Sequence, residues 1–163
     1  MKHLFPILWM LFTPWGATGE TPTCPWLNLA TASGVLRSSA SSPMAVLTGL
    51  SATVCDFTYQ DPVSSRTLKI TVEQAKDPDQ TFIAYRKQCG VTATALHAVG
   101  NEAWMCEADA RGQMYGEQVI GRVRDNIFTV RLSTSLRDDP SIPRETLEEK
   151  ARTIAEQVAG SLF

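Results

Sequence analysis

Residues 118–132 read QVIGRVRDNIFTVRL, and this stretch decides the fold. Apolar and polar residues alternate on both sides of a polar centre, which is the pattern of two half-buried strands joined by a tight turn. With Asp125-Asn126 as a two-residue turn, apolar side chains lie opposite one another on a single face. The expected pairs are Val123 with Phe128, Gly121 with Val130, and Val119 with Leu132. A slip by one residue would destroy this agreement, so the sequence predicts a hairpin in this register.

Three further stretches alternate in the same way. Residues 55–60 and 68–73 place apolar side chains at every second position, and a turn at 61–66 separates them. They are therefore predicted to form an antiparallel pair of strands. Residues 102–108 form another expected strand. Residues 44–54 fit neither the helical nor the strand period, so their structure stays open.

Helical periodicity predicts three helices. The first covers residues 27–37 with Asn28 as its N-cap, and the second begins at Asp77-Pro78 and stops at Gly90. Pro143 opens the third. The expected buried stripe of this third helix comprises Leu147, Ala151, Ile154, Val158 and Leu162. The order α-β-β-α-β-β-β-α predicts an α+β fold, in which helices pack on an antiparallel β-sheet.

The first 19 residues have the pattern of a secretory signal peptide. A basic start precedes an apolar run over residues 4–12, and Ala17-Thr18-Gly19 supplies the small residues of a cleavage site. The run is shorter than the roughly 20 apolar residues that a membrane span needs. We expect cleavage after Gly19, leaving residues 20–163 as a single domain. The sequence thus predicts an exported protein, periplasmic or extracellular and soluble, without a transmembrane span.

Four cysteines, and no C-x-x-C motif, indicate two disulfides in an exported chain. Three pairings are possible. Cys55 and Cys106 lie on predicted strands with their side chains toward the helices, whereas Cys24 and Cys89 flank predicted helices. We favour Cys24–Cys55 and Cys89–Cys106, because each bridge would then join one helix to the sheet. A zinc site is not expected, since no two cysteines have the close spacing of metal-ligand pairs.

Several function classes lack support in this sequence. The formal net charge is −2 with both signs interspersed, so a polybasic surface for nucleic acid is not indicated. No phosphate-binding or dinucleotide-binding glycine motif occurs. His97 is the one histidine left after signal removal, and no G-x-S-x-G motif accompanies it. We predict no catalytic residue, cofactor or metal.

Carboxylate side chains could support one alternative function, that of an enzyme. Glu102, Glu107 and Asp109 could supply the acid and base of a hydrolase, since glycoside cleavage needs two such groups flanking the scissile bond. Acids that alternate along an exposed strand are also common on ordinary surfaces. The enzyme hypothesis requires that these acids converge in a concave pocket.

Arginines on the predicted hairpin form the candidate binding surface. Arg122, Arg124 and Arg131 face away from the apolar side, and Ile120 and Ile127 share their surface. In the predicted register, Arg122 is a diagonal neighbour of Arg131. Guanidinium groups among aliphatic side chains could bind a carboxylate-bearing ligand or a partner protein. The alternative is a solvated face on which these arginines pair with nearby acids.

The chain resembles small exported bacterial domains of unknown function, many of them lipoproteins, with a PsbP-like α/β sandwich. The residues that carry the resemblance are Cys24-Pro25-Trp26-Leu27, Cys55-Asp56-Phe57 and Val99-Gly100-Asn101-Glu102-Ala103-Trp104, together with the hairpin and the C-terminal helix. The lipoprotein members have a lipobox that is missing before Cys24 here. The resemblance implies an envelope location and a binding or accessory role.

The leading hypothesis is a non-enzymatic, secreted or periplasmic binding or accessory module. Its partner would be an envelope protein or a small anionic ligand. A carboxylate-dependent hydrolase and a structural domain without a ligand are the alternatives. The sequence leaves the oligomeric state and the identity of the ligand open.

Overall fold

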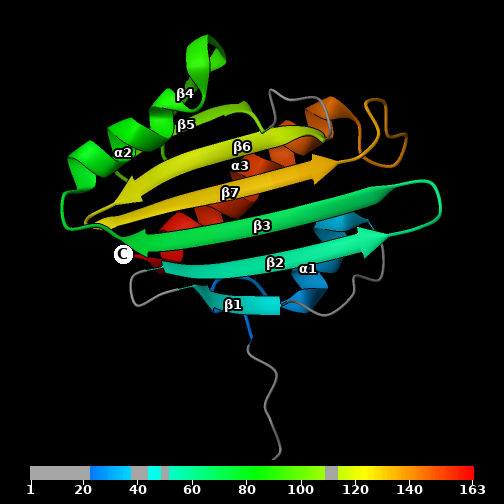
Figure 1. The fold of residues 1–163 in the computed structure, drawn as a ribbon, viewed down its shortest axis with the longest axis horizontal. Helices are drawn as coiled ribbons and strands as arrows, with labels where there is room; N and C mark the ends of the chain where they lie inside the picture. The colour runs from blue at the N-terminus through cyan, green and yellow to red at the C-terminus, as the bar shows by residue number, and fades with distance from the viewer. Residues whose placement is uncertain (1–22, 38–43, 49–51, 109–113) are drawn as a thin grey trace, which may run out of the picture.

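The strands form one antiparallel sheet with helices on both of its faces (Figure 1). The structure is a computed structural model and describes residues 23–37, 44–48, 52–108 and 114–163. The helices are α1 (Leu29–Leu36), α2 (Pro78–Lys87) and α3 (Arg144–Ser161), with a short 3-10 helix at Gly90–Thr92. The strands are β1 (Met44–Thr48), β2 (Ala52–Gln60), β3 (Ser65–Gln74), β4 (Thr94–Leu96), β5 (Glu102–Glu107), β6 (Tyr115–Val123) and β7 (Asn126–Thr134). Their order across the sheet is β1-β2-β3-β7-β6-β5-β4.

The predicted α+β fold is confirmed, with two added strands. β1 lies in the segment whose structure the sequence left open, and it pairs with β2. β4 has only three residues, which is too few for alternation to reveal it, and it pairs with β5 at the other edge. The sheet therefore has one short strand at each edge in addition to the five predicted strands.

Local capping explains where the first two helices begin. The Asn28 side chain accepts a hydrogen bond from the Thr31 amide at 2.8 Å, and the Asp77 side chain accepts one from the Gln80 amide at 3.0 Å. Both contacts satisfy amides that the first turn of a helix leaves without a backbone partner. The two predicted N-caps are therefore confirmed.

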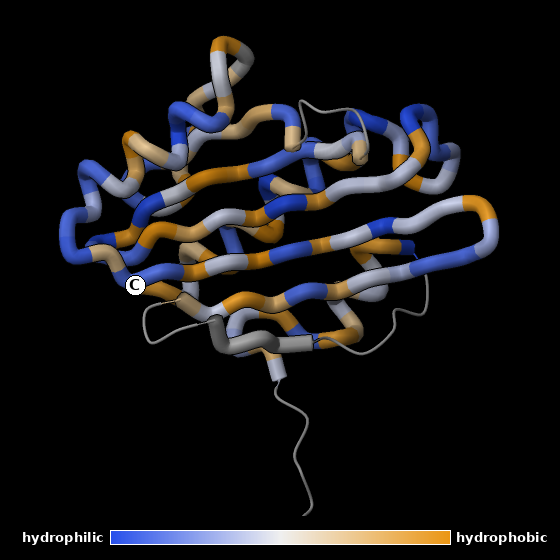
Figure 2. Tube along the Cα trace, in the orientation of Figure 1, coloured by the Kyte–Doolittle hydropathy of each residue, from blue (hydrophilic) through white to orange (hydrophobic). Residues whose placement is uncertain are grey.

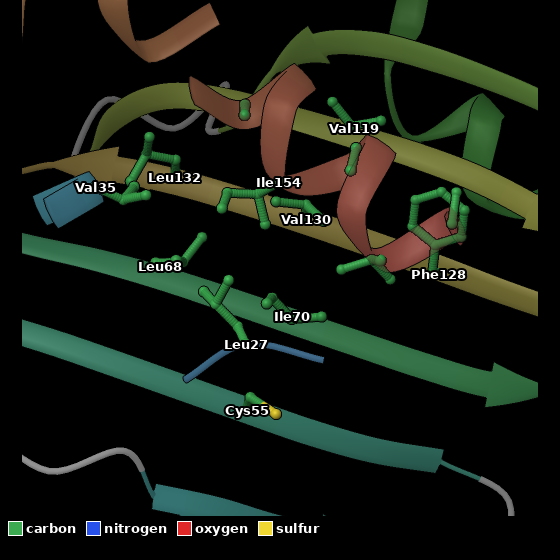
Figure 3. Packing of buried hydrophobic residues seen from close by; sticks show 14 of the residues in the cluster. Leu27, Val35, Cys55, Leu68, Ile70, Val119, Phe128, Val130, Leu132 and Ile154 are labelled. Carbon is green, nitrogen blue, oxygen red and sulfur yellow. The ribbon is translucent and has the colours of Figure 1, made fainter. Parts of the chain in front are cut away.

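One face of the sheet, which we call the α3 face, carries the main core and is covered by α1 and α3. Alternate residues of the central strands point into it, and Figure 2 shows the matching alternation of hydropathy along the tube. Figure 3 shows Leu68, Ile70 and Val130 packed against Ile154 of α3. Of the predicted stripe of α3, Leu147, Ala151, Ile154 and Val158 are buried, and Leu162 packs at the edge of this core.

The opposite face, which we call the α2 face, carries a smaller core under α2. Phe82 of α2 packs there with Ile120 of β6 and Ile127 of β7. Three contacts hold α2 in place. They are the Arg86 guanidinium 3.6 Å from the centroid of the Trp104 ring, the hydrogen bond that the Tyr85 hydroxyl donates to Glu73 at 2.9 Å, and the ion pair between Arg122 and Asp79.

Both predicted disulfides are present, one on each face. Cys24–Cys55 joins the segment before α1 to β2, and Cys89–Cys106 joins the end of the α2 segment to β5. Cys55 belongs to the main core and Cys106 to the smaller one. Each bridge thus attaches one helical segment to the sheet, as the pairing argument required.

The predicted hairpin register is wrong by two residues. The turn consists of Arg124 and Asp125, so Val123 lies opposite Asn126, Gly121 opposite Phe128, and Val119 opposite Val130. A Cβ at residue 121 would lie 2.1 Å from the Phe128 ring, so glycine there makes room for that ring. Asn101 also accepts a hydrogen bond from the Arg124 amide at 2.7 Å. A shift of two keeps every side chain on its face, which is why alternation could not detect it.

Residues 1–19, with the predicted cleavage site after Gly19, lie outside the described residues. In the part of the chain that is described, no helix is long and apolar enough to cross a membrane. The division into a signal peptide and one domain over residues 20–163 stays a prediction.

Candidate functional site

The three arginines of the predicted surface do not form a single cluster. Arg122 lies beside α2 in its ion pair with Asp79, and Arg124 occupies the turn with a φ of 53°. Arg131 of β7 lies opposite Gln118 of β6, and Gln118 is four residues before Arg122 on β6. Four residues of strand span about 13 Å. The predicted diagonal contact between Arg122 and Arg131 is therefore wrong, because it followed from the incorrect register.

The two isoleucines of that surface are buried. Ile120 is 0% exposed and Ile127 is 2% exposed, because α2 covers this part of the sheet. They lie on the same face as the arginines, as predicted, but they cannot offer an exposed apolar surface. The sequence did not indicate which face α2 would cover. Whether any of the predicted residues binds a partner stays a prediction.

α2 covers only part of the α2 face, as far as the described residues show. α2 packs on β6 and β7, and Figure 1 shows no described helix over β2 and β3 on this side. We call this region the open half of the α2 face. Its side chains include half-buried Val54, which lies opposite Thr71. The others that the argument uses are polar or charged, with Lys69 exposed and the rest half-buried, and they are Asp56, Thr58, Lys69, Thr71, Thr129 and Arg131.

Two cations stand directly opposite each other in the open half. Lys69 of β3 pairs with Arg131 of β7 in the register of the sheet. Like charges in this arrangement repel each other and destabilise a sheet. Asp56 lies opposite Lys69 on its other side and partly offsets the repulsion. One row along the strands, Thr71 pairs with Thr129. The open half thus gathers two positive charges beside two hydroxyl groups.

The α3 face carries a different charged cluster, in which carboxylates outnumber cations. Glu107 of β5 lies directly opposite Glu117 of β6. Arg144, at the start of α3, lies 2.7 Å from Glu107, 3.6 Å from Glu117 and 3.5 Å from Glu148, measured between side-chain nitrogen and oxygen atoms. The Arg144 guanidinium therefore lies within ion-pair distance of three carboxylates at the place where α3 meets the sheet.

Glu117 is the buried member of this cluster. It is 5% exposed, and burial raises the pKa of its carboxyl from 4.5 to about 7. Arg144 lowers this pKa, while Glu148 and Glu107 raise it further. Hydrogen bonding to Glu107 in turn raises the pKa of Arg144. Near neutral pH, Glu117 is consequently divided between its protonated and ionised forms.

The predicted carboxylates do not assemble as the hydrolase hypothesis requires. Glu102 accepts a hydrogen bond from Trp104 Nε1 at 3.1 Å on the α2 face, whereas Glu107 lies on the α3 face. Asp109 lies outside the described residues. Sequence reasoning considered Glu117 only as a possible partner of the hairpin arginines and not among these carboxylates, although it shares the alternation of Val119 and Val123. The available signal was a charged residue at a strand position where the alternation places apolar side chains.

A buried ion pair lies near the same end of the α3 face, on β3. Arg66 Nε lies 2.7 Å from Asp139, with side chains only 6% and 1% exposed. Arg66 also donates a hydrogen bond to the Leu36 carbonyl at 3.0 Å. Burial opposes ionisation of Asp139, but hydrogen bonds from Arg66, the Ser141 amide and Thr134 hold its pKa below the ordinary value. This pair ties β3 to the end of α1 and to the loop before α3.

No family model, curated protein or solved structure matches the chain. The resemblance to PsbP-like exported domains therefore stays a prediction. Among the described residues, no group of three or more histidine, cysteine, aspartate or glutamate side chains is arranged to hold a metal ion.

Proposed function

We propose that this chain is an exported, non-enzymatic binding module that holds an anionic ligand on the open half of the α2 face. The observation that carries the proposal is the placement of Lys69 directly opposite Arg131. Like charges in this arrangement repel each other, and an anion beside them would be attracted to both cations. Two disulfides are in keeping with an oxidising compartment outside the cytoplasm.

The position of this pair suits binding better than a structural role. Lys69 is exposed and Arg131 is half-buried, on a part of the sheet that no described helix covers. By contrast, Arg122 on the same face forms an ion pair with Asp79 of α2 and so helps to hold that helix in place. The open half is therefore the part of this face where a ligand would meet cations without displacing a helix.

Thermal unfolding of the purified, oxidised protein tests the proposal. A ligand that binds only the folded state raises its stability in proportion to the logarithm of ligand concentration above Kd. We expect phosphate and citrate, compared with chloride at equal ionic strength, to raise the midpoint of the wild-type protein. The double variant Lys69→Gln with Arg131→Gln should lose this response.

The matched control removes the same two charges elsewhere. Lys76→Gln with Arg152→Gln changes two exposed residues outside the open half. Phosphate and citrate also stabilise proteins by exclusion from their surfaces, and that general effect should be equal in all three proteins. If the wild-type protein responds no more strongly than the double variant, the proposal is wrong.

A carboxylate-dependent hydrolase is the second candidate, and Glu117 is the observation that favours it. A carboxyl whose pKa is about 7, opposite a second carboxylate, has the protonation behaviour of a general acid. The contacts of Arg144 with all three glutamates give these groups a structural role instead. We expect no hydrolysis of aryl glycosides by the wild-type protein. Hydrolysis that Glu117→Gln abolishes would support the enzyme.

A further inference from the structure

We propose that Glu117 and Arg144 form a pH-sensitive latch that holds the start of α3, residues 143–146, on the sheet. The latch is closed when Glu117 is protonated and opens when Glu117 is ionised. Its two residues belong to different elements, because Glu117 lies on β6 and Arg144 is the first residue of α3. Arg144 Nε lies 3.6 Å from Glu117 Oε1. The latch lies on the α3 face, so it is independent of anion binding by the open half of the α2 face.

The start of α3 can move without exposing the main core. Ile142 before it and Leu147 after it are both buried in that core, whereas residues 143–146 between them are exposed or half-buried. Pro143 at the N-cap has no side-chain group that could accept a hydrogen bond from the first amides of the helix. The ion pairs that join this segment to the sheet, among the described residues, are those of Arg144.

The closed latch is a poor environment for an ionised Glu117. Its carboxyl is buried, and Glu107 lies directly opposite it on β5. The Arg144 guanidinium is 65% exposed, and at 3.6 Å it lies beyond hydrogen-bond distance from Glu117, so it compensates only part of the lost hydration. Arg144 also pairs with Glu148 one turn further along α3. Ionisation of Glu117 therefore sets a third carboxylate beside one guanidinium, and opening gives that carboxylate access to water.

The other described charges at this end of the α3 face are engaged with one another. The next row of the sheet and the segments over it carry Tyr115, Arg137 over the Tyr115 ring, and the buried pair of Arg66 with Asp139. Lys150 of α3 instead donates hydrogen bonds to two backbone carbonyls of α1. Arg144 is thus the cation that acts on Glu117, and burial outweighs it, so that the pKa of this carboxyl rises to about 7.

Protonation of Glu117 therefore favours the closed latch. In the open latch, water reaches the carboxyl, and its pKa falls back toward the ordinary value of 4.5. The proton's contribution to closure is fully present below pH 4.5 and is lost as pH rises through about 7. Between pH 5.5 and 8, the ratio of open to closed latch should rise at least about tenfold.

Amide hydrogen exchange of the purified, oxidised protein at pH 5.5 and 8 tests the latch. The Leu147 amide donates a hydrogen bond to the Pro143 carbonyl at 3.0 Å, and this bond breaks when the start of α3 opens. Comparison with Glu117→Gln at each pH cancels the intrinsic pH dependence of exchange. We expect the protection of the Leu147 amide to fall at least about tenfold in the wild-type protein relative to this variant. Amides of residues 155–159, at the far end of α3, should show no such difference.

Two further variants sharpen the test. Glu145→Gln removes an exposed carboxylate from the same segment and is the control, which should follow the wild-type protein. Glu148→Gln removes a carboxylate that raises the pKa of Glu117, so the fall in protection should be smaller than in the wild-type protein. This second variant alters no buried residue, and a fall equal to that of the wild-type protein would count against the latch.

Two other results would overturn the inference. Equal protection of the Leu147 amide in the wild-type protein and Glu117→Gln at both pH values would show that ionisation of Glu117 does not open the start of α3. An equal loss of protection throughout α3 and β6 would show that Glu117 acts on the whole fold rather than on a local latch. Neither result bears on anion binding, because the measurement uses a buffer without multivalent anions.

Discussion

The two faces of the same sheet use charged residues in opposite ways. On the α3 face, Arg66 with Asp139 and Arg144 with Glu117 lie at contacts between the sheet and the segments that cover it. On the open half of the α2 face, Lys69 lies opposite a second cation, Arg131. The first arrangement attaches helices and loops to strands. The second places two like charges side by side, and we propose that these two charges bind an anion.

The largest effect is expected from Asp139→Ala. This change leaves the Arg66 guanidinium buried without its carboxylate, and breaking such a buried pair costs about 3 to 5 kcal/mol. Urea unfolding at pH 7 measures the loss. Asp138→Ala, at the exposed neighbouring position, is the control and should change stability by no more than about 0.5 kcal/mol. Equal losses in the two variants would remove Asp139 from the charges that hold the fold.

The disulfides provide the next effect, with one bridge on each face. Replacing Cys24 and Cys55 by serine, or Cys89 and Cys106, should each cost about 2 to 5 kcal/mol in urea unfolding. The Cys24–Cys55 bridge closes the longer loop, with a sequence separation of 31 against 17, so its removal should cost slightly more. A loss from only one bridge would show that one helical segment attaches to the sheet without its disulfide.

Glu117 predicts a pH dependence of stability. Its pKa is raised in the folded state, so its contribution to stability is fully present below pH 4.5 and is lost as pH rises through about 7. A rise from 4.5 to about 7 corresponds to about 3 kcal/mol. Between pH 5 and 8, the wild-type protein should therefore lose about 2 kcal/mol relative to Glu117→Gln in urea unfolding. Parallel pH profiles for the two proteins would contradict the raised pKa.

The smallest effect on stability is expected from the open half. In a buffer without multivalent anions, Lys69→Gln with Arg131→Gln should change the free energy of unfolding by no more than about 0.5 kcal/mol, because the repulsion that it removes is weak near water. The free energy of unfolding in urea is measured for this double variant and for Asp139→Ala under the same conditions, so that the two losses can be compared directly. A loss above about 2 kcal/mol would place these cations among the charges that hold the fold.

Local rules predicted the features that depend on neighbouring residues. The caps at Asn28 and Asp77 follow from side-chain oxygens that reach amides three residues ahead. The face of each hairpin residue follows from alternation, and both disulfides followed from placing each cysteine on an element. Alternation repeats every two residues, however, so it could not choose between registers that differ by two.

The features that sequence reasoning missed depend on contacts across long stretches of chain. Arg66 and Asp139 are 73 residues apart, and no local pattern links them. The cover that α2 gives to Ile120 depends on which face the helix packs against. Lys69 entered the candidate site only through strand pairing, because β3 and β7 are not consecutive in the chain. Tertiary pairing, rather than local propensity, decides each of these.

Mapping the amide chemical shifts of the protein during a titration with phosphate tests the central claim most directly. The two faces offer competing sites, because Arg144 on the α3 face is 65% exposed and could also attract an anion. We predict that the largest shift changes cluster on β3 and β7, around residues 69–71 and 129–131. Changes that cluster around Glu107 and Arg144 instead, with none in the open half, would contradict the assignment of binding to the α2 face.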